Sequence, residues 1–464
     1  MASSIPSPNP PIRLPYTFAL GAAAACGGLM FGFDIAIIAG AGPFLVAQFD
    51  LSPLEMGLAF SILLFGCALG AVAAGPLSDR FGRRRVMLAV AIVFAVTSVW
   101  TGLAPDYRTL LLARFVGGLG VGAVSVAAPT YVSEISPPSI RGRMGALYQL
   151  SIIFGIFTSY LINYALKDFG PEAWRWMFAS GVAPSIAFFL LVLRAAETPA
   201  YLVRRGRENE ARHVLDRLGG EPADVALTRI RASIAGSARG LRILLEPRLR
   251  RPLAITVVLA VLVHASGINT VIDYAPLILQ SAGFTLDAAL FSTLVLGGAN
   301  LLFTLTSFWT IDRFGRKPLY LVGSLGMATA LAGMMIAVAT GRFEGGLVLA
   351  LIVVYLFFFS SCIGPVFWTL TPELFPNAAR GIAMSVPVLT QWIANAVVVL
   401  VFPSAFAEIG PIGTFALLAG ACILQAMFVQ FFAPETRNRS LEEIEASWAV
   451  GRAPARGRGA MSQE

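Results

Sequence analysis

The sequence DRFGRR at residues 79–84 closes an uncharged stretch that runs from residue 56 to residue 78. It returns as DRFGRK at residues 312–317, again directly after an uncharged stretch, at 288–311. The two copies lie 233 residues apart. A repeat at this distance indicates that a large unit of the chain is duplicated.

Two other matches keep nearly the same spacing. They are Glu134 with Arg141, which return as Glu373 with Arg380 at an offset of 239, and Glu197-Thr198, which return as Glu435-Thr436 at an offset of 238. Each offset spans six long apolar stretches, an even number, so the two halves are predicted to enter a membrane in the same direction. Parallel repeats of this kind are typical of transporters that bind their substrate between the halves.

The composition predicts an all-α integral membrane protein. Of the 464 residues, 57% are apolar and 13% are charged, whereas about 25% are charged in a soluble domain. Twelve stretches of 18 to 28 residues lack Asp, Glu, Lys and Arg, and a bilayer core needs ~20 residues of helix. They are Leu14–Phe33, Met56–Ser78, Val86–Pro105, Phe115–Ser133, Met144–Leu166, Trp176–Leu193, Pro252–Ile272, Ala288–Ile311, Pro318–Gly341, Gly345–Pro372, Gly381–Ala407 and Ile409–Pro434. Twelve transmembrane helices make soluble enzymes and nucleic-acid binders poor candidates, despite a net charge of +8.

Basic residues predict the orientation in the membrane. With both termini in the cytoplasm, 29 of the 34 Lys and Arg residues lie on the cytoplasmic side and four lie outside. The positive-inside rule therefore favours cytoplasmic termini in a multi-pass protein of the cell membrane. The remaining basic residue, Arg114, falls within a span.

The domain organisation follows from these patterns. We expect a disordered N-terminal tail at 1–15, a six-helix half at 16–194, a cytoplasmic helical linker at 195–251, a second six-helix half at 252–434, and a C-terminal helix and tail at 435–464. Within the linker, Glu208–Leu218 is amphipathic and contains the i,i+4 pairs Glu208/Arg212 and Arg212/Asp216. No cleavable signal peptide is expected.

Cysteine usage argues against a metal centre or a disulfide framework. All four cysteines, Cys26, Cys67, Cys362 and Cys422, fall in apolar spans, where a thiol behaves as a small hydrophobic group. We expect neither a metal site nor a cofactor. The lipid bilayer is an expected partner, nucleic acid is not, and the oligomeric state is open.

Several motifs together resemble the sugar porter family of the major facilitator superfamily. They are the doubled DRFGR[RK] loop, PETR at 434–437, Gly267-Ile268-Asn269 and Gln391-Trp392, and the resemblance covers roughly residues 17 to 445. It implies twelve-helix, alternating-access transport of monosaccharides or polyols, either facilitative or driven by protons.

Ionisable residues well inside the spans are few: Asp34, Arg114, His264 and Asp273. A charge in hydrocarbon is costly, so each is a functional candidate. Arg114 cannot deprotonate, and Asp34 is its best partner, either as a permanent structural ion pair or as a proton switch. Paired with Arg114, Asp34 stays ionised, and in an apolar site without that partner it takes a proton. The resemblance implies the proton switch, because both residues match positions used by proton-coupled members, and so it favours symport over uniport.

Sugar binding requires amide side chains and an aromatic face. The resemblance places the sugar-contacting positions at Gln149, Asn269, Asn300, Trp368, Gln391 and Trp392. Joining helices within the membrane is the alternative role for each of these side chains.

The seventh span departs from the family pattern. Most members carry two glutamines before the Gly-Ile-Asn motif and a tyrosine four residues after its Asn, where this chain has Val263, His264 and Asp273. His264 is a sugar ligand, a titrating group or an interhelical hydrogen bonder. Asp273 accepts bonds from hydroxyls, favours a cationic or unusual polyol substrate, or is buried against backbone or His264. Asn269 and Asp273 are i,i+4 and should share a face.

Charges of both signs recur beside the cytoplasmic ends of the spans. They are Asp79, Arg83, Glu134, Arg141, Glu197, Asp312, Arg316, Glu373, Arg380 and Glu435. We expect salt bridges that hold one face closed and break when it opens, in preference to separate solvated charges worth ~0–1 kcal/mol per pair.

Four other functions compete with proton-coupled symport. Within transport, a uniporter or a carrier of another small polar solute is possible, the second because of His264 and Asp273. A sugar sensor usually carries long cytoplasmic extensions, and here about 30 residues follow Pro434. An integral membrane enzyme is least favoured, since no set of nucleophile, His and carboxylate is apparent.

Overall fold

The computed structural model describes residues 12–137, 139–236, 244, 246–375 and 379–437. Within these residues all regular structure is helical, and twelve helical spans are long and apolar enough to cross a membrane. The predicted all-α membrane fold is therefore confirmed. Most of the predicted tail at 1–15 and the C-terminal helix expected near residue 440 lie outside the described residues.

Seven helices build the N-terminal half: α1 (Leu14–Phe49), α2 (Pro53–Phe81), α3 (Arg83–Gly102), α4 (Tyr107–Ile135), α5 (Arg141–Leu166), α6 (Ala173–Ala179) and α7 (Val182–Arg194). The sixth span consists of α6 and α7. α1 and α4 extend beyond the predicted uncharged stretches because Asp34 and Arg114 lie inside them.

The C-terminal half is more interrupted. It contains α11 (Pro247–Ala265), α12 (Ile268–Asp273), α13 (Ala275–Ser281), α14 (Leu286–Phe314), α15 (Arg316–Ala339), α16 (Gly345–Phe358), a π-helical segment (Phe359–Ile363), α17 (Gly364–Glu373), α18 (Arg380–Ala383), α19 (Ser385–Glu408) and α20 (Gly410–Phe432). α11 begins five residues before the predicted bound at 252, since Pro247 starts its first turn.

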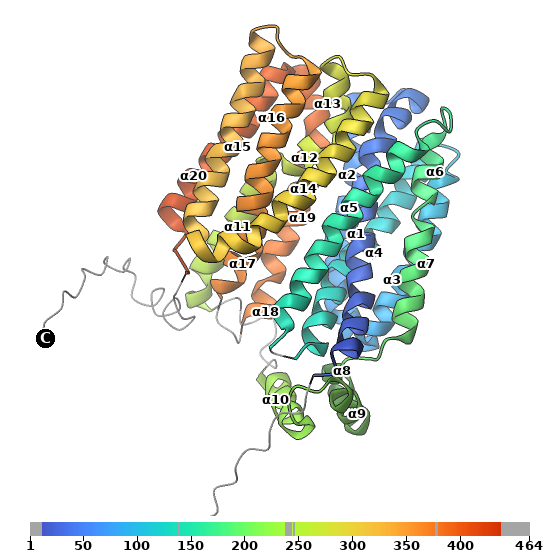
Figure 1. The fold of residues 1–464 in the computed structure, drawn as a ribbon, viewed down its shortest axis with the longest axis vertical. Coiled ribbons are helices and arrows are strands. Elements are labelled where there is room, and N and C mark those ends of the chain that lie inside the picture. Colours follow the sequence, from blue (N-terminus) through green and yellow to red (C-terminus); the bar gives the residue numbers. More distant parts are fainter. Residues whose placement is uncertain (1–11, 138, 237–243, 245, 376–378, 438–464) are drawn as a thin grey trace, which may run out of the picture.

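The two halves stand side by side, and the linker helices lie at one end of the bundle, below the N-terminal half (Figure 1). These are α8 (Pro199–Arg204), α9 (Glu208–Leu218) and α10 (Ala223–Gly236). We call this the linker end of the bundle, and the other the opposite end.

The helix expected at Glu208–Leu218 forms with those bounds, but its ion pairs differ from the prediction. Arg212 pairs with Asp224, and Glu208 with Arg231, both on α10. The predicted i,i+4 pairs Glu208/Arg212 and Arg212/Asp216 do not form among the described residues, because the neighbouring helix offers better-placed partners.

The doubled motif makes the same turn in both halves. Gly82 and Gly315 have φ of +95° and +88°, a conformation that glycine adopts without strain. In each copy a carboxylate then accepts hydrogen bonds from the first backbone N–H groups of the next helix: Glu197 from Arg83 (3.1 Å), and Glu435 from Arg316 (3.1 Å). A Cβ on either glycine would collide with that carboxylate. The motif thus fixes the junctions α2–α3 and α14–α15.

Two spans contain a break in their regular α-helix. Gly267, with φ of +85°, separates α11 from α12, and an added Cβ would lie 2.7 Å from the Leu418 side chain. The π-helical segment interrupts the tenth span. Broken helices within a membrane expose backbone and side-chain groups where transporters bind their substrates.

The two halves contact each other at the opposite end. The ring of Phe60 on α2 stacks on Tyr274, with centroids 4.3 Å apart, and Lys167 pairs with Asp287 at 2.9 Å. A Cβ on Gly57 would collide with the Leu400 carbonyl, so α2 and α19 lie in close contact there. The opposite end is therefore tightly packed.

Candidate functional site

The predicted partners Asp34 and Arg114 lie together in the membrane interior. Nη1 of Arg114 on α4 donates to Oδ1 of Asp34 and to its backbone carbonyl on α1, each at 3.1 Å. The Arg114 side chain is 2% exposed and that of Asp34 is 19% exposed. The guanidinium also lies over the ring of Phe178, 5.1 Å from its centroid.

This ion pair leaves hydrogen-bonding capacity unused. Nε and Nη2 of Arg114 are buried and have no hydrogen-bond partner among the described residues. A buried guanidinium stays charged, so only the carboxyl of the pair can change its protonation state. The arrangement can hold a proton on Asp34 in one state and an ion pair in another.

Three of the amide side chains predicted to contact the sugar are half-buried. Gln149 lies on α5, Asn269 on α12 and Gln391 on α19. Oε1 of Gln391 is buried without a hydrogen-bond partner in the described part of the chain. Asn300 differs, because its Oδ1 accepts a 2.7 Å bond from Ser360 of the π-helical segment. That bond joins two helices, the alternative role that intramembrane amides serve.

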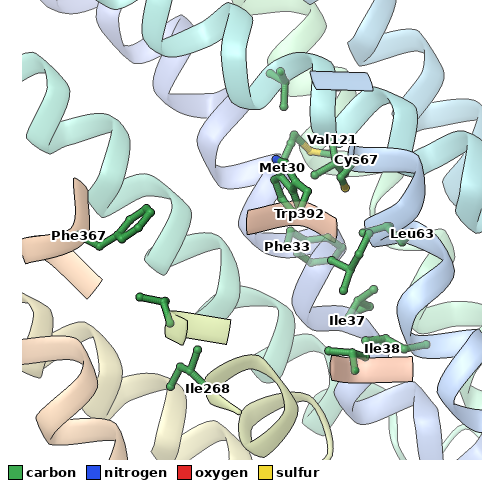
Figure 2. Packing of buried hydrophobic residues seen from close by; sticks show 14 of the residues in the cluster. Met30, Phe33, Ile37, Ile38, Leu63, Cys67, Val121, Ile268, Phe367 and Trp392 are labelled. Carbon is green, nitrogen blue, oxygen red and sulfur yellow. The ribbon is translucent and has the colours of Figure 1, made fainter. Parts of the chain in front are cut away.

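The two candidate tryptophans occupy different surroundings. Trp392 is 9% exposed and packs edge-on against Phe31 of α1, with centroids 5.7 Å apart. It belongs to the same core cluster as Met30 and Phe33 (Figure 2). Trp368 on α17 is 44% exposed. Trp392 therefore bridges the halves, whereas Trp368 offers an open aromatic face.

His264 and Asp273 flank the break in the seventh span. Both are 6% exposed, and Asn269 and Asp273 lie one turn apart on α12. Neither ring nitrogen of His264 has a hydrogen-bond partner among the described residues. Nor does Asp273 pair with His264 or with backbone within those residues, so the buried pairing weighed from sequence is not formed in this structure.

The charges at the linker end form matching clusters within each half. Arg83 pairs with Asp79 (3.0 Å) and Glu134 (3.1 Å), and Arg316 pairs with Glu373 (3.0 Å). Thr436 also donates to Glu373 (2.6 Å).

Arg141 is exposed and lies outside these pairs, its guanidinium 3.4 Å from the Ser136 carbonyl. The side chains of Asp312 and Arg380 lie outside the described residues. The ion pairs Arg83–Asp79, Arg83–Glu134 and Arg316–Glu373 each lie within one half of the molecule.

Sequence reasoning missed the groups that join the halves at the opposite end. Lys167 pairs with Asp168 and Asp287, and these carboxylates raise the pKa of its amine. Close to this pair, Tyr164 packs against Phe291, with centroids 5.6 Å apart. Opposite charges just after the fifth span and at the start of the eighth were the only available signal, and they do not identify partners.

Comparison with known proteins places these features in one family. Residues 20–448 match the family described as "Sugar (and other) transporter". The chain belongs to this sugar transporter family. The resemblance to the sugar porters of the major facilitator superfamily is confirmed.

Individual relatives match over nearly their full length. The arabinose-proton symporter of Bacillus subtilis (strain 168) is 36% identical over 95% of this chain and 98% of its own. The D-xylose transporter of Levilactobacillus brevis is 37% identical over 91% of this chain and 94% of its own. The partially occluded inward open structure of the xylose transporter XylE from E. coli superposes with a TM-score of 0.82, at 31% identity over 92% of this chain and 100% of that one.

Proposed function

We propose that this transporter carries a monosaccharide together with a proton by alternating access. The observation that carries the proposal is the buried Asp34–Arg114 pair, the only part of the predicted site that holds both signs of charge inside the membrane among the described side chains. The relatives include an arabinose-proton symporter and a D-xylose transporter. Together with the ion pair, these relatives favour symport of a pentose. A polyol is the second substrate class to test.

Within this proposal the described residues divide into three roles. Asp34 and Arg114 couple transport to protons. Gln149, Asn269, Gln391 and the two tryptophans contact the sugar, and Asn300 supports the site through Ser360. The linker-end charges form the gate.

The packing supports a proposal for the conformational state of the transporter and for its orientation in the membrane. The halves are in close contact at the opposite end, whereas at the linker end the ion pairs Arg83–Glu134 and Arg316–Glu373 each lie within one half. We take the linker end as cytoplasmic, in agreement with the positive-inside count, and the state as inward-facing. The protein then lies in the cell membrane with both termini in the cytoplasm.

The test is transport by the purified protein in liposomes. Labelled pentoses, hexoses and inositols are offered with and without an inward proton gradient. Accumulation of a pentose above its external concentration, only with the gradient, is the expected result. Equal uptake with and without the gradient would indicate a uniporter instead.

The amide side chains give a separate prediction. Gln149→Ala and Gln391→Ala should each weaken sugar binding by roughly 1–3 kcal/mol, because truncation leaves buried hydroxyls unsatisfied. This corresponds to about a 5- to 150-fold increase in Kd, measured by calorimetry. Unchanged Kd in both variants would remove these amides from the site. Gln430→Ala is the control, because Gln430 is an exposed residue at the linker end of α20.

A second candidate is transport of a different small polar solute. His264 and Asp273 favour it, because they replace an amide and a tyrosine of the family pattern with a titratable ring and a carboxylate. Competition of unlabelled amines and inositols against a labelled pentose distinguishes the two candidates.

A further inference from the structure

Helices α5 and α14 lie side by side across the boundary between the two halves (Figure 1). Leu294 of α14 packs against the cluster that contains Tyr160 of α5, and an added Cβ on Gly297 would lie 2.6 Å from the Tyr160 ring. One turn further along α5, Tyr164 packs against Phe291 of α14, with ring centroids 5.6 Å apart. Residue numbers rise along α5 as they fall along α14, so the two helices are antiparallel and stay in contact toward the opposite end.

An ion pair continues this line of contacts at the opposite end. Nζ of Lys167, the residue that follows α5, lies 2.9 Å from Oδ1 of Asp287 in the first turn of α14. A helix N-terminus favours a negative charge, which keeps the Asp287 carboxylate ionised. The Lys167 side chain is only 15% exposed, and its amine lies 4.9 Å from the centroid of the Tyr164 ring. The amine therefore depends on carboxylates for much of its stabilisation.

Lys167 has a second partner, which belongs to its own half. Its amine lies 2.7 Å from Oδ2 of Asp168, the next residue along the chain. Because Asp168 is the chain neighbour of Lys167, it stays within reach of the amine whether or not the two halves separate here. Asp287 belongs to the other half and moves away when they separate. Of these two ion pairs, only the one with Asp287 requires the opposite end to be closed.

We propose that Lys167, Asp168 and Asp287 form a reversible latch at the opposite end of the transporter. Asp287 stabilises the closed state of this end, and Asp168 keeps a carboxylate beside the Lys167 amine when the end opens. An amine that lost every carboxylate would oppose opening, whereas an amine that exchanges two carboxylates for one opposes it less. The closed state is thus stabilised without being locked. This inference rests on the proposed alternating access and not on proton coupling.

Neutralising the two carboxylates should shift the conformational equilibrium in opposite directions. Asp287→Asn removes the ion pair that exists only in the closed state, so the opposite end should open more often. In Asp168→Asn, opening would leave the amine without either carboxylate, so the end should stay closed for more of the time. Each variant should change the ratio of open to closed protein about two- to five-fold, as expected for a partly exposed ion pair. Residues that only assist folding would not give effects of opposite sign.

Labelling of an introduced cysteine measures this opening. Leu294→Cys is suitable, because Leu294 is half-buried in the contact between the halves and becomes accessible when α5 and α14 separate. In lipid nanodiscs, a maleimide should label this cysteine faster when Asp287→Asn is added and more slowly when Asp168→Asn is added. Asp287→Glu keeps the charge and is the matched control, with an unchanged rate. Protein without the introduced cysteine gives the background from the four native cysteines.

A double-mutant cycle assigns the effect to the ion pair. Lys167→Met removes the amine and keeps a long side chain, and it should increase labelling as Asp287→Asn does. Adding Asp287→Asn to Lys167→Met should then cause no further change. Asp287→Ser is a second neutral variant in case the asparagine variant does not fold, and size-exclusion chromatography verifies the folding of each protein.

Two results in folded variants would overturn the proposal. One is an unchanged labelling rate in Asp287→Asn, and the other is a rate in Asp168→Asn that is unchanged or increased. Failure of alternating access is recognised separately, with D-xylose and arabinose as probes. If neither sugar alters the labelling of Leu294→Cys and neither enters liposomes that contain the wild-type protein, the transport proposal fails, whatever the two Asp variants show.

Discussion

Asp34→Asn should abolish sugar accumulation driven by a pH gradient, lowering the inside-to-outside ratio to about one, while exchange of bound sugar stays at least partly active. The amide keeps the shape of the carboxyl but cannot bind and release a proton. Exchange requires only that the loaded carrier reorients. Accumulation and counterflow of a labelled pentose, measured in the same liposome preparation, give both quantities.

Asp50→Asn is the matched control for this variant. Asp50 follows the last residue of the same helix, is exposed, and has φ of +47°, a conformation that Asn also tolerates. It should accumulate sugar as the wild type does. If Asp34→Asn still accumulates sugar against its gradient, Asp34 is not the coupling site.

Glu373→Gln should lose net transport while sugar affinity stays within a few fold. In the state described here Glu373 accepts bonds from Arg316 and Thr436. We propose that Glu134, Arg141, Glu373 and Arg380 link the halves when the linker end closes. Loss of one charge then shifts the population toward the state open at that end. Transport assays and calorimetry measure the two quantities.

Cysteine labelling tests the direction of this shift. A cysteine is introduced at the linker end, where it faces the boundary between the two halves. It should be labelled faster in Glu373→Gln than in the protein with the wild-type Glu373. Glu408→Gln is the control, since Glu408 is exposed at the far end of α19. Normal turnover together with unchanged labelling would show that the gate residues are only separate solvated charges.

The spans and the Asp34–Arg114 ion pair could be predicted because both follow from the cost of placing charge in hydrocarbon. Twelve uncharged stretches are required for twelve crossings, and a lone Arg114 requires a carboxylate. The turn at Gly82 and Gly315 could be detected as a sequence repeat. The reason that each turn has a glycine became clear only in the structure, where the carboxylates of Glu197 and Glu435 occupy the space that a Cβ would need.

The helix breaks and the contacts between halves could not be predicted from the sequence. Gly267 is one of 45 glycines, and the Leu418 side chain that an added Cβ would meet comes close to it only in the folded protein. The partner of Lys167 depends on which end of the carrier is closed. The i,i+4 ion pairs predicted within α9 do not form in the described structure, because folding brings α10 close and α10 offers alternative partners.

Coupled movement of sugar and proton is the central claim, and sugar-driven proton uptake tests it most directly. Liposomes that contain the protein and an internal pH dye, with no initial pH gradient, receive external D-xylose or arabinose. The account predicts internal acidification that follows sugar entry in the wild type and is absent in Asp34→Asn. Entry of the sugar into wild-type liposomes without any change in internal pH would contradict it.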